Sequence, residues 1–570
     1  MHWIREVRNG SATTGTRGKK TRRGASNGSR HGHSVSTEAV SKAAHRYSFS
    51  SELTPLSIAS LITPAEDLTV DVPWLRAVFT ETWETIFGHW MSRYGCPFVF
   101  GDENIAESFI SISSLCGQLD KWMAADSGRA NDHTYSGFSE AFTDIDTDHQ
   151  TRMSLERVIL AFAARWLPLA SSSTPLDTAS TQETIVRLWR EARADMLNVI
   201  NRPTYRSMLT LYLFGLTPIP DGITDEEELS GMSGSLCVQA SLQQVYMLRV
   251  RQRSLQFSGS KVSPVTEKTF SLSPDPVATN NFMNAESIAH WAALIFDTSA
   301  SLTLSCRPIL SSGLFGFESD WCWCLVRSCT ELFQGTISGW TGEMTESKAN
   351  QVIAAGSMTK LRTWKLEAVF REALRDGHDE SAVNKVYNEI IDGIEQFNQV
   401  YGDLLEACQK RIHFLSQATK LRWHELILHY NIGILLIVDA IEATERYDLL
   451  PRLSAARTEA EISVLNVLKF GIENTYTITL RSGTSPGSIG LDDGRTTVPI
   501  LAIDPYPHHV VAAVQLMRKA VDRDLATDRI NEDTHSNLNG ILRRALDLLP
   551  GSSKSVVSAR RQVGLDMDDT

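Results

Sequence analysis

The sequence predicts an all-α fold, a multi-helix globular regulatory domain behind a disordered, basic N-terminal arm. Apolar residues return every three or four positions through most of the chain, which is the period of an amphipathic helix. The two-residue alternation that is typical of strands is scarce. With 570 residues, of which 42% are hydrophobic and 21% charged, the chain can bury a large core.

The predicted arm covers residues 1–60. Gly, Ser, Lys and Arg dominate residues 10–50 without a hydrophobic period, so burial could not offset the entropy lost on ordering them. Residues 1–50 hold ten Lys/Arg against two Glu, a net charge of +8 in a chain whose net charge is −12. The remaining 520 residues therefore carry −20, and we expect them to repel nucleic acid.

One part of the arm suggests a function. The run "KKTR", Lys19 to Arg22, has the clustered form of a nuclear-import signal, and flexible cations can also contact phosphates. The alternative is an ordinary solvated linker. We expect import or phosphate contact to involve Arg17, Lys19, Lys20, Arg22, Arg23 and Arg30.

The first helix is expected soon after the arm. Asp71 can cap it and Pro73 suits its first turn. An apolar stripe then follows at spacings of four, four, three and four, and Pro97 is expected to end the helix. The stripe consists of Leu75, Phe79, Trp83, Ile86 and Trp90.

Similar segments continue through a domain predicted at 65–480. They lie near 103–125, 153–168, 182–216, 235–256, 284–306, 319–336, 359–375, 380–416, 419–446 and 454–475. A helical pair is expected at 508–525 and 533–549 within a C-terminal unit at 501–549, followed by a tail at 550–570. Loop composition marks 169–180, 221–231, 257–281 and a flexible segment at 481–500. "TYTITL", Thr475 to Leu480, is the main strand candidate.

The most apolar stretch, Leu426 to Ile441, is 16 residues long and carries His429, Asn431 and Asp439. A helix that crosses a bilayer needs about 20 largely apolar residues, and polar side chains are costly there. We therefore expect a buried core helix and no membrane partner.

Cysteine usage indicates reduced thiols in a core. The eight cysteines are irregularly spaced and mostly lie in apolar runs, unlike a disulfide framework. In "CWCLVRSC", Cys322 and Cys329 share a helical face but are separated by about 10 Å along the axis. That separation is too large for two ligands of one zinc ion, so core packing is the better interpretation.

Two motifs resemble catalytic signatures. "HELILH" places His424 and His429 five residues apart, about 140° apart on a helix, whereas a zinc protease needs a spacing of four. "GTSPG" around Ser485 fits a nucleophile elbow, with Asp492 and His508 following in the chain order of hydrolases. Pro486 and the glycines after it disfavour the required helix, and no α/β alternation surrounds it. We expect no enzyme; a hydrolase using Ser485 and His508 is the rival.

A family resemblance is carried by "ESIAHWAALIFDTSASLTLSCRPILSSGLFG", Glu286 to Gly316. A helix with Trp291 and the step Phe296-Asp297 leads through small residues to Arg307-Pro308. This stretch resembles the regulatory, or middle homology, region of fungal zinc binuclear cluster transcription factors, of the xylanolytic-activator type. Packing alone would make Trp291 and Phe296 core residues and Pro308 a helix stop.

Two other stretches agree with this resemblance. "VFTETWETIFGHWMSRYGCPFVF", Val78 to Phe100, is similar to the opening aromatic helix of that region, and Arg187 to Leu216 to its arginine helix, loop and apolar helix. The resemblance covers about 74–446. It implies a nuclear regulator of RNA polymerase II genes, controlled by an effector, a partner or an autoinhibitory contact. The implied partners are DNA and the transcription machinery or coregulators, and the resemblance allows a homodimer.

The chain departs from the family pattern at its N-terminus. The family binds two zinc ions through six cysteines there, but the first cysteine here is Cys96, inside the helical body. Zinc is thus expected only in an intact N-terminal cluster, and no cofactor in this chain. The basic arm occupies the place of the linker that follows the cluster. Either the chain is truncated or it belongs to a form that lost the cluster; an interaction protein without DNA contact is the alternative. We expect only weak, salt-sensitive DNA binding through residues 17–30.

Overall fold

The prediction of an all-α fold is confirmed in the part of the chain that can be described. The computed structural model describes residues 72–130, 139–170, 178–253, 257–258, 261–262, 280–303, 307–479 and 495–565. The segment from Asp71 onward is one compact unit built of helices and two short β-hairpins. All six cations of the basic run lie outside the described residues.

The opening aromatic helix is interrupted and shorter than expected. It consists of α2 (Val72–Phe79), the π-helical turn η2 (Thr80–Glu84) and α3 (Thr85–Trp90). The five stripe residues are all buried, as expected. Pro97 does not end the helix. The chain leaves it at Ser92, whose hydroxyl donates to the carbonyl of His89, and Pro97 instead begins the 3₁₀ turn η3 (Pro97–Val99).

Two helices begin where a distant carboxylate caps them. The helix expected at 103–125 is α4 (Ile112–Ala130). It begins later than expected because Glu84 Oε1 caps it there, accepting from the backbone N–H of Ser113 at 3.1 Å. Asp120 on α4 in turn accepts from the backbone N–H of Tyr205 at 2.8 Å. The segment expected at 182–216 thereby divides into α7 (Thr178–Ile200) and α8 (Tyr205–Leu216).

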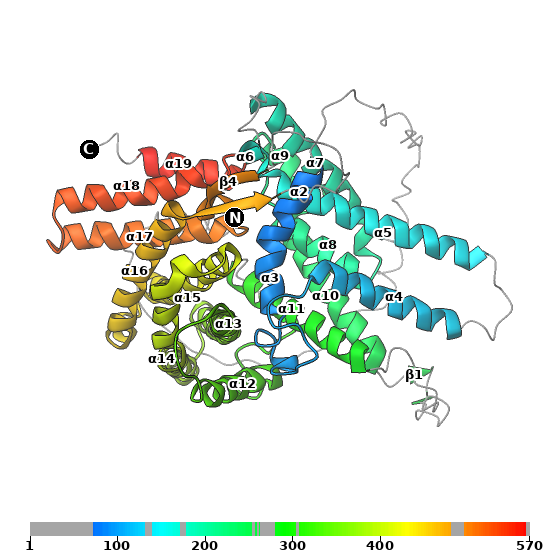
Figure 1. The fold of residues 1–570 in the computed structure, drawn as a ribbon, viewed down its shortest axis with the longest axis horizontal. Helices are drawn as coiled ribbons and strands as arrows, with labels where there is room; N and C mark the ends of the chain where they lie inside the picture. The colour runs from blue at the N-terminus through cyan, green and yellow to red at the C-terminus, as the bar shows by residue number, and fades with distance from the viewer. Residues whose placement is uncertain are drawn as a thin grey trace, which may run out of the picture. The chain divides into compact units, whose positions relative to one another are not determined.

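The remaining elements of the first half surround these helices (Figure 1). The loop expected at 221–231 contains the short helix α9. Helix α10 packs closely on α8 because Gly215 has no Cβ; a Cβ there would lie only 2.9 Å from the carbonyl oxygen of Gly234. These elements are α5 (Ser139–Ala164), α6 (Leu167–Ala170), α9 (Asp225–Leu229), α10 (Gly234–Arg253), β1 (Phe257–Ser258), β2 (Lys261–Val262) and α11 (Asn280–Thr303).

Helix α13 (Glu346–Arg375) lies at the centre of the second half, with α12, α14 and α15 packed around it (Figure 1). It begins 13 residues before the predicted start at 359, because Ala349 to Met358 are almost all buried and no amphipathic stripe marks them. Its neighbours are α12 (Trp321–Ile337), α14 (Glu380–Arg411), η7 (Ile412–Phe414), α15 (Gln417–Ala443), η8 (Tyr447–Leu449) and α16 (Leu450–Glu473).

The strand prediction is confirmed and its partner was missed. β3 (Thr475–Thr479) pairs antiparallel with β4 (Arg495–Pro499), which falls inside the segment expected to be a flexible loop. The sequence "RTTVP" has little strand character by itself, and only the pairing of Tyr476 with Val498 and its neighbours makes it a strand. Ser485 and Asp492 lie outside the described residues.

The C-terminal helices belong to the same compact unit as the body. They are η9 (Ile500–Ile503), α17 (Pro507–Ala526), α18 (Glu532–Leu548) and α19 (Lys554–Leu565). The predicted tail is wrong at α19, where Val556 is fully buried and Lys554 pairs with Asp225 and Glu228 of α9. A sequence that lacks a strong apolar stripe is held here by its remote partners.

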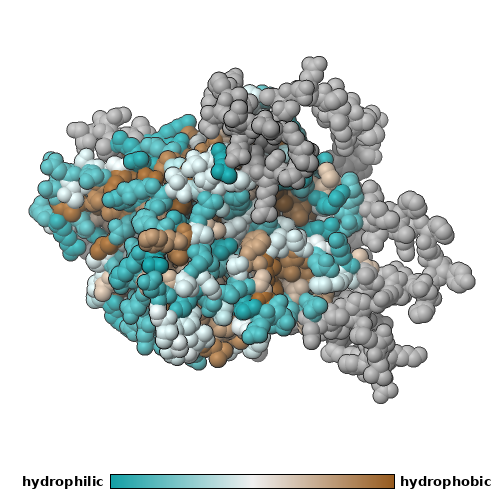
Figure 2. Space-filling model, in the orientation of Figure 1, coloured by the Kyte–Doolittle hydropathy of each residue, from teal (hydrophilic) through white to brown (hydrophobic). Residues whose placement is uncertain are grey.

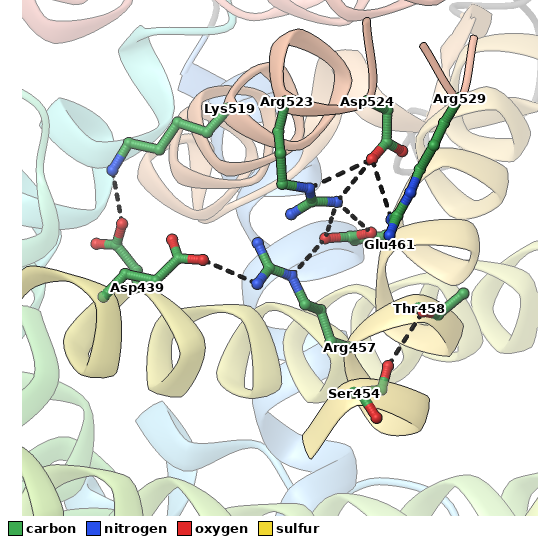
Figure 3. Close-up of polar contacts among 10 residues, drawn as sticks. Asp439, Ser454, Arg457, Thr458, Glu461, Lys519, Arg523, Asp524 and Arg529 are labelled. Carbon is green, nitrogen blue, oxygen red and sulfur yellow. Dashed lines mark hydrogen bonds and ion pairs between the residues drawn. The ribbon is translucent and has the colours of Figure 1, made fainter. Parts of the chain in front are cut away.

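An ion-pair network joins α15, α16 and α17 (Figure 3). Glu461 on α16 accepts from Arg457 Nε at 3.0 Å and from Arg523 Nη2 on α17 at 3.0 Å. Lys519 on α17 also reaches Asp439 on α15 at 2.6 Å. These contacts fix the C-terminal pair to the body, so residues 501–549 are no separate domain.

Helix α15 is a core helix, as expected. Among the described helices, it alone is long and apolar enough to cross a membrane, but 67% of its most apolar window is buried inside the protein.

The visible face of the molecule is mostly hydrophilic, with separate hydrophobic patches (Figure 2).

Candidate functional site

The residues that carry the family resemblance meet at the loop between α11 and α12. Asp297, 1% exposed, lies on the penultimate turns of α11. Its Oδ1 accepts from the backbone N–H of Ile309 at 2.8 Å. Its Oδ2 accepts from the N–H groups of Leu310 at 3.0 Å and Ser311 at 3.1 Å. One carboxylate thus binds three consecutive peptide groups; we call Arg307–Ser312 the Asp297 loop.

The Asp297 loop is also tied to α13. Lys365 Nζ donates to Ser311 Oγ at 2.9 Å, and Arg307 Nε lies 3.1 Å from Glu372 Oε1. A second carboxylate, Asp320, accepts from Ser312 N–H at 2.9 Å and caps α12 through Cys322 N–H. The loop is therefore a rigid joint between α11, α12 and α13.

Burial sets the charge state of this joint. It raises the pKa of Asp297, while the peptide N–H groups and the Lys365 ammonium act in the opposite direction. Burial also lowers the pKa of Lys365 to about 8, and the charge of Asp297 opposes that change. The side chains of Asp297, Lys365 and Ser311 are engaged in hydrogen bonds to the loop backbone and to one another.

A second polar cluster lies in the core between α15 and α17. His429 Nε2 is 2.9 Å from Glu425 Oε2, one turn earlier on α15, and 2.9 Å from His509 Nδ1 on α17. Burial, followed by the charge of Asp504, raises the pKa of Glu425 well above its usual value. Burial and the neighbouring His509 lower the pKa of His429 well below its usual value. Both shifts favour the neutral forms of Glu425 and His429.

The "HELILH" histidines are core residues. His424 and His429 are 0% and 1% exposed. No group of three or more His, Cys, Asp or Glu among the described residues could hold a metal ion. Cys322 and Cys329 are buried thiols, whereas Cys324 is exposed. Burial raises the pKa of Cys329 to about 12, which disfavours a thiolate ligand.

Of the two residues proposed for the rival hydrolase site, Ser485 and His508, the structure describes only His508. His508 lies near the start of α17, and burial lowers its pKa to about 3, which makes it a weak base at neutral pH. The structure does not describe Ser485 and therefore does not bring it together with His508.

Sequence reasoning missed the buried charges of α13. Lys360, Lys365 and Glu367 are each at most 3% exposed. The available signal was "SMTKLRTWKLEAVF", in which charged residues fall on every side of a helix that its neighbours enclose.

Comparison with protein-family models, curated proteins and solved structures gave no match for this chain.

Proposed function

We propose that the chain is the regulatory body of a fungal transcription regulator of the zinc binuclear cluster class. In this proposal it acts on RNA polymerase II genes in the nucleus, and it acts by conformation and contact rather than by catalysis. The proposal is supported by one observation: the separated residues of the regulatory-region resemblance form one connected joint.

The spacing of these residues has a physical reason. Pro308 has no backbone N–H to donate, and the next three residues supply the N–H groups that Asp297 binds. Arg307, just before the proline, reaches Glu372 and Asp376 on α13. These contacts give a physical reason for the spacing between the Asp and the Arg-Pro step.

Such a joint suits a regulatory domain. It couples three helices through buried charge-assisted hydrogen bonds, so a partner that moves α12 must also act on α11 and α13. The proposed partners are coregulators or the transcription machinery, and a homodimer. DNA would be held weakly by the basic arm.

The role of the arm has its own test. Replacing Arg17, Lys19, Lys20, Arg22, Arg23 and Arg30 by Gln should abolish nuclear accumulation of a fluorescent fusion and remove DNA binding in a filter assay at low salt. The wild-type binding should fall steeply with salt and be the same for unrelated sequences. Strong preference for one DNA site would contradict this part of the proposal.

The proposal as a whole is tested by tethering. The full chain is fused to a heterologous DNA-binding domain, and transcription of a reporter carrying its site is measured. A several-fold change in reporter output, retained by Ser485→Ala, supports a regulator. An esterase activity that Ser485→Ala removes would support the hydrolase instead. An unchanged reporter would favour an interaction protein without a role at DNA.

A further inference from the structure

A small cavity lies in the core where α3, α8, α11, α13, α15 and α17 meet. Its walls are largely aromatic and include Trp90, Trp364 and Tyr506, and its free volume is about 20 Å³. Its polar lining side chains include Lys360 from α13, His429 from α15 and His509 from α17, together with Ser299 and Ser357. A cavity of this size holds one or two waters or a solute of a few non-hydrogen atoms.

Lys360 is the unusual member of this wall. Its side chain is 3% exposed, and its Nζ lies 4.8 Å from the ring centroid of Trp90 and 4.4 Å from that of Trp364. In the described part of the chain, no residue offers Nζ a hydrogen-bond acceptor or an ion pair. The two indole faces stabilise a cation, but they leave its N–H groups without acceptors.

A comparison within α13 shows that this is no general property of buried lysines here. Lys365, five residues later and 2% exposed, donates to Ser311 Oγ at 2.9 Å and lies near Asp297. The carboxyl group whose charge acts on Lys360 is Glu425, and burial together with Asp504 favours its neutral form. Lys360 thus lacks both a hydrogen-bond partner and a full counter-charge.

We propose that the cavity binds a small carboxylate anion, of formate or acetate size, with Lys360 as its charge partner. The carboxylate would accept from Nζ, and the apolar part would pack against the aromatic walls. The side chains of His509 and Tyr506 line the same cavity. The inference stands on the cavity and on Lys360, whether or not the chain regulates transcription.

The test is a binding titration of the full chain. Sodium formate, acetate and chloride are added at pH 6 and at constant ionic strength maintained with sodium sulfate. Heat is followed by calorimetry, and tryptophan fluorescence reports on Trp90 and Trp364. We expect saturable binding of formate or acetate, at least tenfold weaker in Lys360→Met and unchanged in Lys365→Met. No saturable binding, or equal binding by Lys360→Met, overturns the proposal, and chloride that binds as tightly as acetate overturns the carboxylate class.

The variant itself provides a folding check. Methionine keeps most of the lysine stem and removes an unpaired buried charge, so Lys360→Met should melt at the same temperature as the wild type or higher. Acetate should raise the melting temperature of the wild type and leave that of Lys360→Met unchanged. Should Lys360→Met fail to fold, Lys360→Gln takes its place in both measurements.

Discussion

Asp297 accepts a hydrogen bond at 2.8 Å from the backbone N–H of Ile309, twelve residues further along the chain. The bond joins the last turns of α11 to the loop that leads into α12. Because the carboxylate is buried and also binds Leu310 and Ser311, its removal would leave three peptide N–H groups without an acceptor.

Replacing Asp297 by Ala should therefore lower the free energy of unfolding by about 2–4 kcal/mol. Asn keeps one acceptor oxygen, so Asp297→Asn should lose about half as much. Urea denaturation measures both values. Thr303→Ala, which removes a methyl group and a hydroxyl that bonds within α11, is the control and should change stability by less than about 1 kcal/mol. Equal values for Asp297→Ala and the control would refute the role of the carboxylate.

Because of the buried Glu367, we expect the free energy of unfolding to fall as the pH rises. Its side chain is fully buried, neither carboxyl oxygen has a hydrogen-bond partner, and burial raises its pKa to about 8. The folded state thus holds a proton that the unfolded state releases above about pH 4.5. The stabilisation is complete below that pH and is lost as the pH rises to 8, by about 1.4 kcal/mol per unit.

Glu367→Gln cannot titrate, so the difference in unfolding free energy between wild type and this variant should change over that range. Urea denaturation at pH 5, 6, 7 and 8 measures it. Glu395→Gln changes an exposed residue on α14 and should leave the wild-type profile unaltered. Parallel profiles for wild type and Glu367→Gln would show that the carboxyl group is not buried as described.

His89 predicts the opposite dependence at acid pH. It is fully buried, its Nδ1 lies 2.8 Å from the carbonyl oxygen of Ser108, and burial, followed by the charge of Arg422, lowers its pKa to about 3. The neutral ring stabilises the fold above about pH 6.5, where both states are unprotonated. That stabilisation is lost as the pH falls from about 6.5 toward 3.

His89→Asn retains a donor for Ser108 but has no titrating ring. Relative to this variant, the wild type should lose about 1.4 kcal/mol of stability per pH unit below 6.5. Unfolding free energies at pH 7, 5.5 and 4.5 provide the comparison. The exposed His413, changed to Asn, is the matched control and should follow the wild type. A wild type that tracks His89→Asn throughout would contradict the assignment.

The C-terminal helix α19 should matter for stability. Val556 is fully buried, whereas Ser558 on the same helix is exposed. Aspartate at 556 would place a carboxyl group in the core and should cost at least about 2 kcal/mol, whereas Ser558→Asp should cost little. Thermal melting of the two variants decides this. Equal melting temperatures would mean that residues 554–565 form a loose tail after all.

The sequence correctly predicted the helices that bury only one face. The stripe from Leu75 to Trp90 and the core positions Trp291 and Phe296 could be read from spacing, because the period of a half-buried helix is visible in the order of residues. The strand at 475–479 was also visible, since alternation of β-branched and aromatic residues marks it.

The missed features depend on partners that are distant in the chain. The start of α4 is set by Glu84, β4 exists because β3 pairs with it, and α19 is anchored by ion pairs with α9. The buried start of α13 has no polar face to reveal it. The role of Asp297 was hidden for the same reason, because an Asp near a helix end reveals nothing about the loop it binds.

The most direct test of the central claim is the tethered reporter with a change at the joint. Wild type, Asp297→Asn and Thr303→Ala are fused to the same heterologous DNA-binding domain and compared at equal protein levels. The account predicts that wild type and Thr303→Ala change transcription by the same several-fold factor and that Asp297→Asn loses most of this effect. The account is contradicted if no fusion alters reporter output. It is equally contradicted if the Asp297→Asn fusion alters reporter output as much as the wild-type fusion does.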